Sequence, residues 1–178
     1  MSLSMHQASV VAFTRTLSNL KAIIAKTKAH ALEQKIEEAV YISARLSPDM
    51  LPFSRQVQIA SDIARGAAAR LSGVEPPAYE DNEKSFDDLS ARIQRTIDYM
   101  EGLDAKAFDD AATRQIIRPV RGEPHTFTGV NYLMQFAMPN VYFHAATAYG
   151  ILRHNGVPLG KADYVGFMFR YLRAPQEA

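Results

Sequence analysis

Cysteine is absent from the 178-residue chain, long apolar runs are absent too, and the net charge is close to zero. Without cysteine the chain has no disulfide, no thiolate metal site and no cysteine nucleophile, and nothing points to an oxidising compartment. No run approaches the ~18 apolar residues of a membrane span. Twenty basic and nineteen acidic residues give a net charge of +1, which does not favour nucleic acid as a partner. We therefore expect neither nucleic-acid binding nor membrane association.

The N-terminal segment lacks the basic region, apolar block and small-residue cleavage site of a secretory signal, so we expect a cytoplasmic protein. The composition, with 47% hydrophobic and 22% charged residues, is that of an ordinary soluble globular protein. A chain of this length fits one domain, and we expect residues 1–178 to form it.

Apolar residues recur at spacings of three and four along four segments, which predicts four long helices. Those helices cover about residues 4–34, 47–71, 85–100 and 129–154. A short helical piece at about 36–44 turns the chain after the first helix. Between the third and fourth helices, residues 114–120 and 123–128 predict a small β-hairpin, in which Pro119 must lie on an edge or a bulge. The sequence thus predicts an all-α fold, a four-helix bundle with one hairpin.

Residues at the helix ends carry start and stop signals. Ser47 followed by Pro48 is typical of a helix start, because the hydroxyl caps free N–H groups and proline needs no donor there. Gly73 is expected to stop the same helix. Ser85 with Asp88 resembles a capping box that begins the third helix, after an exposed loop.

Two polar residues interrupt the apolar stripe of the fourth helix. Asn140 and His144 lie four residues apart in the series Val130, Leu133, Ala137, Asn140, His144, Thr147 and Ile151. A buried polar group without a partner costs about 1 to 3 kcal/mol, so both side chains need a hydrogen-bonding partner. Pro139 removes one helical hydrogen bond and predicts a kink or break just before Asn140. This pair marks the most promising place for a site.

On the second helix, Gln56 is the strongly polar member of the apolar face, whereas Gln58, Asp62 and Arg65 group on the solvent side. If the second and fourth helices pack together, Gln56 meets Asn140 and His144. The three side chains then form either a structural hydrogen-bond network that fixes helix register or a site for a ligand or a vestigial metal.

A histidine such as His144 serves as a base or a metal ligand near neutral pH, but catalysis requires a partner that orients it. No carboxylate lies at helical spacing from His144 on its own helix. Asp49, before the second helix, is a candidate from across the bundle, although it equally suits a role at the helix dipole. The remaining histidines have no mutual spacing suited to a metal site, and we expect them on the surface.

Two blocks of the sequence resemble an uncharacterised bacterial branch of the DinB-like (YfiT-like) superfamily. They are NVYFHAATAYGILRHNGVPLGKADYVG at 140–166 and PDMLPFSRQVQIASD at 48–62, and the likeness covers nearly the whole chain. The resemblance implies a four-helix bundle in the DinB arrangement, often a homodimer. Better-studied relatives bind a divalent metal through three histidines, and some are thiol-dependent S-transferases or metal-dependent hydrolases.

By position, His144 matches the histidine that opens the H-R-G-Q segment of these relatives, because both patterns reach an arginine nine residues later, here Arg153. Asn140 corresponds to the ligand four residues earlier, and Gln56 is the candidate for the position on the second helix. One of three ligands remains, and a Gln, Asn, His set is a poor site for zinc or nickel. The resemblance therefore implies a degenerate metal site with no resident metal.

The sequence consequently favours a small-ligand-binding or interaction protein whose ligand contacts are Gln56, Asn140 and His144. The alternative is an enzyme in which His144, aided by a weakly held metal or by Asp49, acts on a small substrate, as in a thiol-dependent transferase or hydrolase. We also expect a homodimer. That expectation is based on an alanine stripe in the second helix and an aromatic C-terminal segment, namely Ala60, Ala64 and Ala67, and Tyr164, Phe167, Phe169 and Tyr171.

Overall fold

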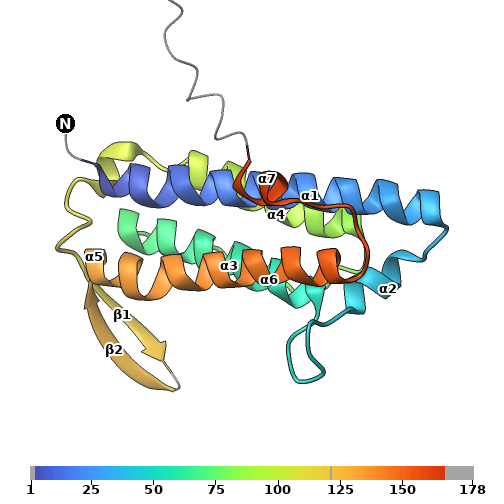
Figure 1. Cartoon of the computed structure of the whole chain (residues 1–178). Helices are drawn as coiled ribbons and strands as arrows, with labels where there is room; N and C mark the ends of the chain where they lie inside the picture. The colour runs from blue at the N-terminus through green and yellow to red at the C-terminus, as the bar shows by residue number, and fades with distance from the viewer. Residues whose placement is uncertain (1–2, 121, 167–178) are drawn as a thin grey trace, which may run out of the picture.

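The computed structural model describes residues 3–120 and 122–166, which form a mostly helical bundle (Figure 1). The long helices are α1 (Ala12–Gln34), α3 (Phe53–Ser72), α4 (Phe86–Glu101) and α6 (Met138–His154). The hairpin of β1 (Gln115–Val120) and β2 (Glu123–Thr128) lies between α4 and α6 in the chain, which confirms the predicted fold class. The shorter elements are η1 (Gln7–Val11), α2 (Glu38–Ser43), η2 (Ala105–Phe108), α5 (Gly129–Asn131), η3 (Tyr132–Ala137) and α7 (Lys161–Val165).

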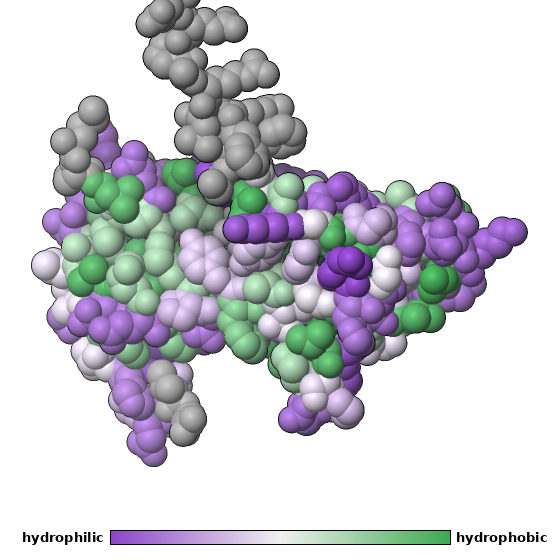
Figure 2. Space-filling model, viewed as in Figure 1, coloured by the Kyte–Doolittle hydropathy of each residue, from purple (hydrophilic) through white to green (hydrophobic). Residues whose placement is uncertain are grey.

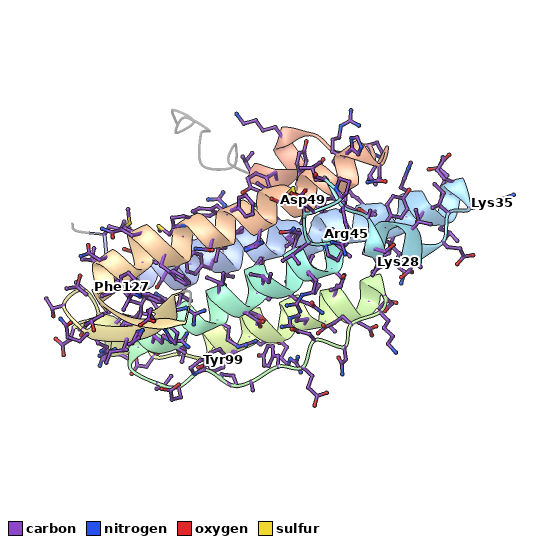
Figure 3. The ribbon with its side chains drawn as sticks, turned by 90° about the horizontal axis from the view of Figure 1, so that it is seen from below. Lys28, Lys35, Arg45, Asp49, Tyr99 and Phe127 are labelled. Carbon is purple, nitrogen blue, oxygen red and sulfur yellow. The ribbon has the colours of Figure 1, made fainter. Side chains whose placement is uncertain are left out.

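The helices run in two directions, α1 and α6 in one and α3 and α4 in the other (Figure 1). Because α3 and α4 are consecutive and parallel, the chain between them must return along the length of the bundle. The segment 73–85 does so, and Figure 3 shows it running beside α3 and α4. We call this segment the crossover loop.

The predicted signals at the end of α3 and the start of α4 are confirmed. Gly73 follows α3 with φ of 83°, the left-handed conformation that favours glycine. At the start of α4 the backbone N–H of Asp88 donates to Ser85 Oγ at 3.1 Å, and the N–H of Ser85 donates to Asp88 Oδ2 at 3.0 Å. The capping box is therefore complete, with Asp in place of the usual Glu.

The predicted start of α3 at Ser47–Pro48 is wrong, because the helix begins at Phe53. The hydroxyl of Ser47 donates to Asp49 Oδ1 at 2.6 Å instead of accepting from a helical N–H, and the segment forms a turn. Pro52 disfavours helical geometry at the residue before it, so the helix starts only after this second proline.

The predicted irregularity before Asn140 is confirmed in a specific form. The helical run that begins at Gly129 widens into the π-helical turns of η3 and returns to α-helical geometry at Met138. Pro139 is the second residue of α6 and lies inside this continuous helical run, so its missing N–H removes one helical hydrogen bond. The wider turns absorb the proline ring and let the helix continue.

Helix α3 is the centre of the bundle and packs against both α4 and α6. Its alanine stripe, Ala60, Ala64 and Ala67, is fully buried in this core. Small side chains let three helices approach closely, but they do so within one chain. The stripe is therefore unavailable for self-association, and this part of the argument for a dimer is wrong.

The hairpin lies at the end of the bundle where α3 ends and η3 begins (Figure 1). It is antiparallel, with Pro119 opposite Pro124. A two-stranded sheet has only edge strands, so both prolines are tolerated. Immediately after β2, the backbone at Gly129 approaches Ala111 so closely that a Cβ would lie 1.8 Å from the Ala111 carbonyl oxygen. Glycine at this position lets the hairpin lie against the bundle.

After α6 the chain turns back, and α7 packs against α1. The side-chain amide of Asn19 donates to the Tyr164 carbonyl at 3.0 Å, which holds α7 in place. The other aromatic residues of the expected C-terminal patch, Phe167, Phe169 and Tyr171, lie outside the described residues. Among the helices that are described, none combines the length and the apolar character needed to cross a bilayer.

Candidate functional site

The structure brings together Gln56 of α3 and His144 of α6, the two residues that the apolar stripes predict to face each other. The side-chain amide of Gln56 donates to the Leu51 carbonyl at 2.9 Å, which identifies its nitrogen. Its Oε1 therefore accepts from His144 Nδ1, 2.7 Å away. This bond fixes the tautomer of the imidazole, with the proton on Nδ1 and a lone pair on Nε2.

Burial and charge state differ between the two partners. Gln56 is only 2% exposed and has both ends of its amide engaged, whereas His144 is half-buried. Burial lowers the pKa of His144 below its ordinary value of 6.5, so the ring is neutral at pH 7. Within the described part of the chain, Nε2 of His144 has no hydrogen-bond partner. The imidazole thus presents one free acceptor nitrogen.

Asn140 does not join this pair by a hydrogen bond. Its side-chain amide donates to the Phe136 carbonyl of the preceding turn at 2.7 Å. That contact satisfies a backbone oxygen beside the π-helical turns and needs no ligand. The polar residue that interrupts the apolar stripe at 140 therefore has a local partner, in contrast to His144, whose partner lies on another helix.

Asp49, the candidate carboxylate partner of His144, lies exposed in the turn before α3. Its hydrogen bond from the Ser47 hydroxyl lowers the pKa of the Asp49 carboxyl. Because α3 begins at Phe53, Asp49 is also not at the helix mouth where a dipole role was considered. The residue that orients His144 is Gln56, a neutral amide in place of a carboxylate.

The three positions do not fit a divalent metal. Gln56 Oε1 is bonded to a ring N–H of His144, and Asn140 is turned toward its own helix. Across residues 3–120 and 122–166, no three His, Asp or Glu side chains gather in a way that would hold a metal ion. Zinc and nickel sites require several strong nitrogen, sulfur or carboxylate donors. A single imidazole with two committed amides does not supply them.

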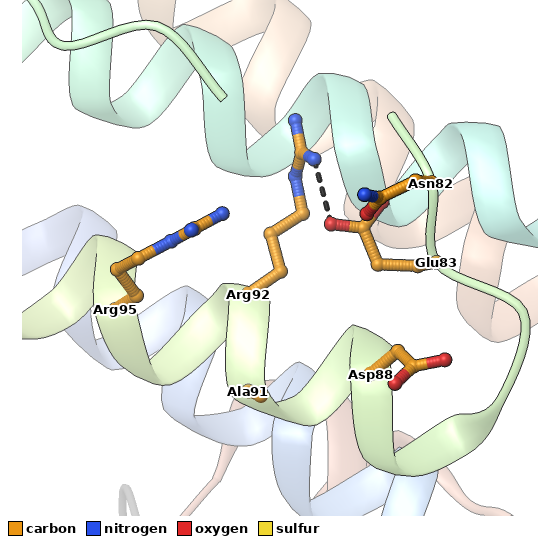
Figure 4. A pocket seen from close by; sticks show the side chains of 6 residues that line it. All are labelled: Asn82, Glu83, Asp88, Ala91, Arg92 and Arg95. Carbon is orange, nitrogen blue, oxygen red and sulfur yellow. Dashed lines mark hydrogen bonds and ion pairs between the residues drawn. The ribbon is translucent and has the colours of Figure 1, made fainter. Parts of the chain in front are cut away.

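A second polar cluster was not predicted from the sequence. The helical pattern predicted that Gln58 and Arg65 lie on the solvent side of α3. Both are buried, with 3% and 7% of their surface exposed, because the crossover loop covers them. At its centre is Arg92 of α4, whose side chain is fully buried. Its guanidinium pairs with Asp62 Oδ1 at 2.7 Å, Asp81 Oδ1 at 2.9 Å and Glu83 Oε1 at 2.8 Å. Figure 4 shows Arg92 and Glu83 facing each other between α4 and the loop.

Aromatic stacking adds to this attachment of the loop. The Tyr79 ring lies between two guanidinium groups, with Arg65 Cζ 3.8 Å and Arg95 Cζ 3.7 Å from the ring centroid. The signal for this cluster was present in the sequence as charge complementarity. The loop carries acidic residues, and the helices on either side of it carry arginines at positions 55, 65, 92 and 95. Helical periodicity alone does not show that a loop will cover one face.

Comparison with known proteins agrees with this architecture. The sequence model of a family described as a domain of unknown function, DUF1993, matches residues 5–165. A crystal structure of a DinB family member protein from Shewanella denitrificans is 40% identical in sequence, with a TM-score of 0.86. That similarity covers 98% of this chain and 95% of the other. No curated protein is similar enough to count as a match.

Proposed function

This chain belongs to the DUF1993 family and has a DinB-like fold, and we propose that it binds a small molecule that donates a hydrogen bond to His144. The observation that carries the proposal is the free Nε2 of a neutral imidazole whose orientation is fixed by the buried Gln56. A hydroxyl, amide or thiol group matches this acceptor. In this proposal the metal position of DinB relatives has become a binding position without metal.

A general base is the second candidate role for His144. A neutral imidazole with a lowered pKa and a fixed tautomer is the form that accepts a proton near neutral pH. This role keeps the chain within the reaction classes that the resemblance implies, a thiol-dependent transferase or hydrolase. It differs from binding alone in one measurable respect, because a base at His144 gives a rate that falls when the imidazole is protonated.

The binding proposal is tested by nitrogen NMR of histidine-labelled protein. Mercaptoethanol, glycerol and acetamide serve as thiol, hydroxyl and amide probes. We expect at least one probe to shift the Nε2 resonance of His144 while the Nδ1 proton stays bonded to Gln56. His144→Gln is the matched variant, because it keeps a polar side chain but lacks the acceptor nitrogen. If every probe leaves the Nε2 resonance unchanged, the Gln56–His144 bond is purely structural and the proposal is wrong.

Metal content gives an independent test of the degenerate site. We expect the purified protein to hold much less than one equivalent of zinc or nickel, because the donor set at positions 56, 140 and 144 is weak. Elemental analysis after expression in medium containing both metals measures this. Stoichiometric metal that disappears in His144→Gln would show that His144 retains a ligand role.

We also propose that the protein is a homodimer that uses the outer face of η3 and α6. From Gly129 to Leu152 the sequence has no Asp, Glu, Lys or Arg. Figure 2 shows apolar side chains gathered over the start of α1 and over η3 and the first half of α6. The exposed large apolar residues of η3 and α6 include Met134, Tyr142 and Phe143, and Val11 ends η1 directly before α1. Interface cores are depleted in charge and enriched in Tyr, Phe and Met, so a second copy packed on this face accounts for its composition.

A further inference from the structure

A cavity of about 170 Å³ lies between α3, the crossover loop, β1 and η3. Its charged lining consists of Asp62, Arg65 and Arg70 from α3 and Arg118 from β1. The stacked rings of Tyr132 and Phe136 from η3 form one wall, with centroids 5.6 Å apart and planes inclined by 13°. Neither Gln56 nor His144 lines this cavity, which makes it a place distinct from the proposed His144 site.

The cavity has an excess of positive charge. Its one carboxylate, Asp62, is shared between Arg92 Nη2 at 2.7 Å and Arg65 Nη1 at 2.9 Å. Among the described residues, no carboxylate forms an ion pair with Arg70 or Arg118. Three guanidinium groups thus face one acidic group that already serves a fourth. Such an imbalance in a confined space favours an anion.

Among the residues that the structure describes, Arg65 and Arg118 have buried N–H groups without an acceptor. Arg65 is more than nine-tenths buried, and its Nε has no hydrogen-bond partner within residues 3–120 and 122–166. Its Nη1 lies near Asp62 but lacks hydrogen-bond geometry there. The Nε of Arg118 is likewise buried and has no partner in the described part of the chain. Buried donors normally have an acceptor, so these N–H groups point to a missing one.

Arg70 donates one N–H to the Gly66 carbonyl at 2.9 Å, and the aromatic wall lies against the face of Arg118. The Arg118 guanidinium lies over the Phe136 ring, with Cζ 4.9 Å from the centroid, so its face is occupied, whereas its Nε–H has no acceptor among the described residues. Burial raises the pKa of Tyr132, which keeps its hydroxyl protonated and able to donate. A guanidinium edge matches the planar oxygens of a carboxylate or the oxygens of a phosphate.

We propose that this cavity binds a small oxyanion, a carboxylate or phosphate group held by Arg65, Arg70 and Arg118. The volume of about 170 Å³ is sufficient for the anionic group and a small remainder. The stacked rings of Tyr132 and Phe136 offer a flat apolar wall for that remainder. This site is additional to His144 and does not depend on it.

Calorimetric titration with three probes at constant ionic strength tests the proposal. Inorganic phosphate and benzoate represent the two oxyanions, and benzamide is the uncharged match for benzoate. We expect phosphate, benzoate or both to bind. If benzoate binds, benzamide should bind at least ~10-fold more weakly than benzoate, because it lacks the negative charge. The ratio of the phosphate affinity to the benzoate affinity shows whether the cavity prefers a phosphate group or a carboxylate group. If neither anion binds, the proposal is overturned.

A matched pair of variants separates a specific site from general charge. Arg118→Met removes a guanidinium from the cavity, whereas Arg153→Met removes one from an exposed position on α6. We expect Arg118→Met to weaken anion binding by ~10-fold or more and Arg153→Met to have little effect. Equal losses in both variants would overturn the proposal. Arg70→Met provides a second cavity variant, with circular dichroism to confirm that each variant folds.

The His144→Gln variant keeps the two proposals separate. We expect it to bind the anions as the unmodified protein does, because His144 does not line the cavity. Loss of anion binding in His144→Gln would contradict the independence of the two sites. Failure of the NMR test at His144, in contrast, leaves the outcome of the anion titration unaffected.

Discussion

Two faces of the same bundle differ in charge and in what covers them. The face of α3 and α4 under the crossover loop is rich in charge, and the chain covers it with its own acidic and aromatic residues. The outer face of η3 and α6 has no charged residue between Gly129 and Leu152, yet Met134 and Phe143 are each 56% exposed. Where the chain supplies a cover, the buried Arg92 pairs with three acidic side chains of the same chain. Where the described chain supplies none, the apolar composition favours a cover from a second molecule.

The largest loss of stability is expected when the ion pairs under the crossover loop are broken. Arg92→Met leaves Asp62, Asp81 and Glu83 without their shared cation, and the Glu83 side chain is only 5% exposed. Breaking a buried ion pair by removing one partner costs about 3 to 5 kcal/mol, and urea unfolding measures this loss. The double variant Arg92→Met with Glu83→Gln should recover part of the stability. Lys28→Met, which breaks the exposed pair with Asp87, should lose far less.

The next effect concerns the seam between the two faces, where Gln56 of α3 meets His144 of α6. Gln56→Ala leaves the Leu51 carbonyl and the His144 Nδ1 proton without their partners. We expect a loss of about 1 to 3 kcal/mol in the free energy of unfolding. Gln34→Ala, at an exposed position on α1, is the control. If the two variants are equally stable, the Gln56 amide contributes nothing to the packing of α3 on α6.

The apolar outer face of η3 and α6 is tested by placing a charge on it. Light scattering of the unmodified protein should give twice the chain mass of 19.8 kDa. Met134→Lys should raise the dimer dissociation constant ~10-fold or more, because each copy then buries an unpaired ammonium group. Ile117→Lys changes an apolar residue on the hairpin that is 67% exposed, and it should leave the dimer intact. A mass near 19.8 kDa at every concentration of unmodified protein would contradict the homodimer.

The smallest effect is a pH dependence at the same seam. Burial lowers the pKa of His144 in the folded state below 6.5, so the unfolded chain binds a proton more readily. The stability that the neutral ring contributes is therefore present above pH 6.5 and is lost as pH falls through the folded-state pKa. Urea unfolding at several pH values should show this decline in the unmodified protein. His144→Gln should show a flatter profile over the same interval.

Local patterns in the sequence predicted the local features of this fold. The helices, the hairpin, the capping box at Ser85 and the left-handed Gly73 each depend on residues close together in the chain. The contact of Gln56 with His144 was also predictable, because both interrupt apolar faces that a bundle must bring together. Those faces are set by helical periodicity, which short segments reveal.

The failures have non-local causes or competing local bonds. The pattern of α3 predicts that Arg65 faces solvent, because nothing in α3 shows that the crossover loop returns over it. Asn140 reads as a partner of His144, but the helix itself offers a closer acceptor at Phe136. Ser47 reads as a helix cap, yet its hydroxyl bonds to Asp49 and Pro52 delays the helix. In each case a local pattern indicated one environment, and a group outside that pattern determined the partner.

The π-helical turns of η3 have a consequence for how insertions and deletions act in this chain. A π-helical turn contains more residues than an α-helical one, so η3 holds more residues than α-helical turns would in its place. Deleting one residue within η3 would let it relax to α-helix and keep His144 directed at Gln56. Deleting one residue within α6 before His144 would instead rotate the imidazole by about 100° around the helix. A one-residue deletion within η3 should therefore preserve the contact between His144 and Gln56, whereas one within α6 before His144 should break it.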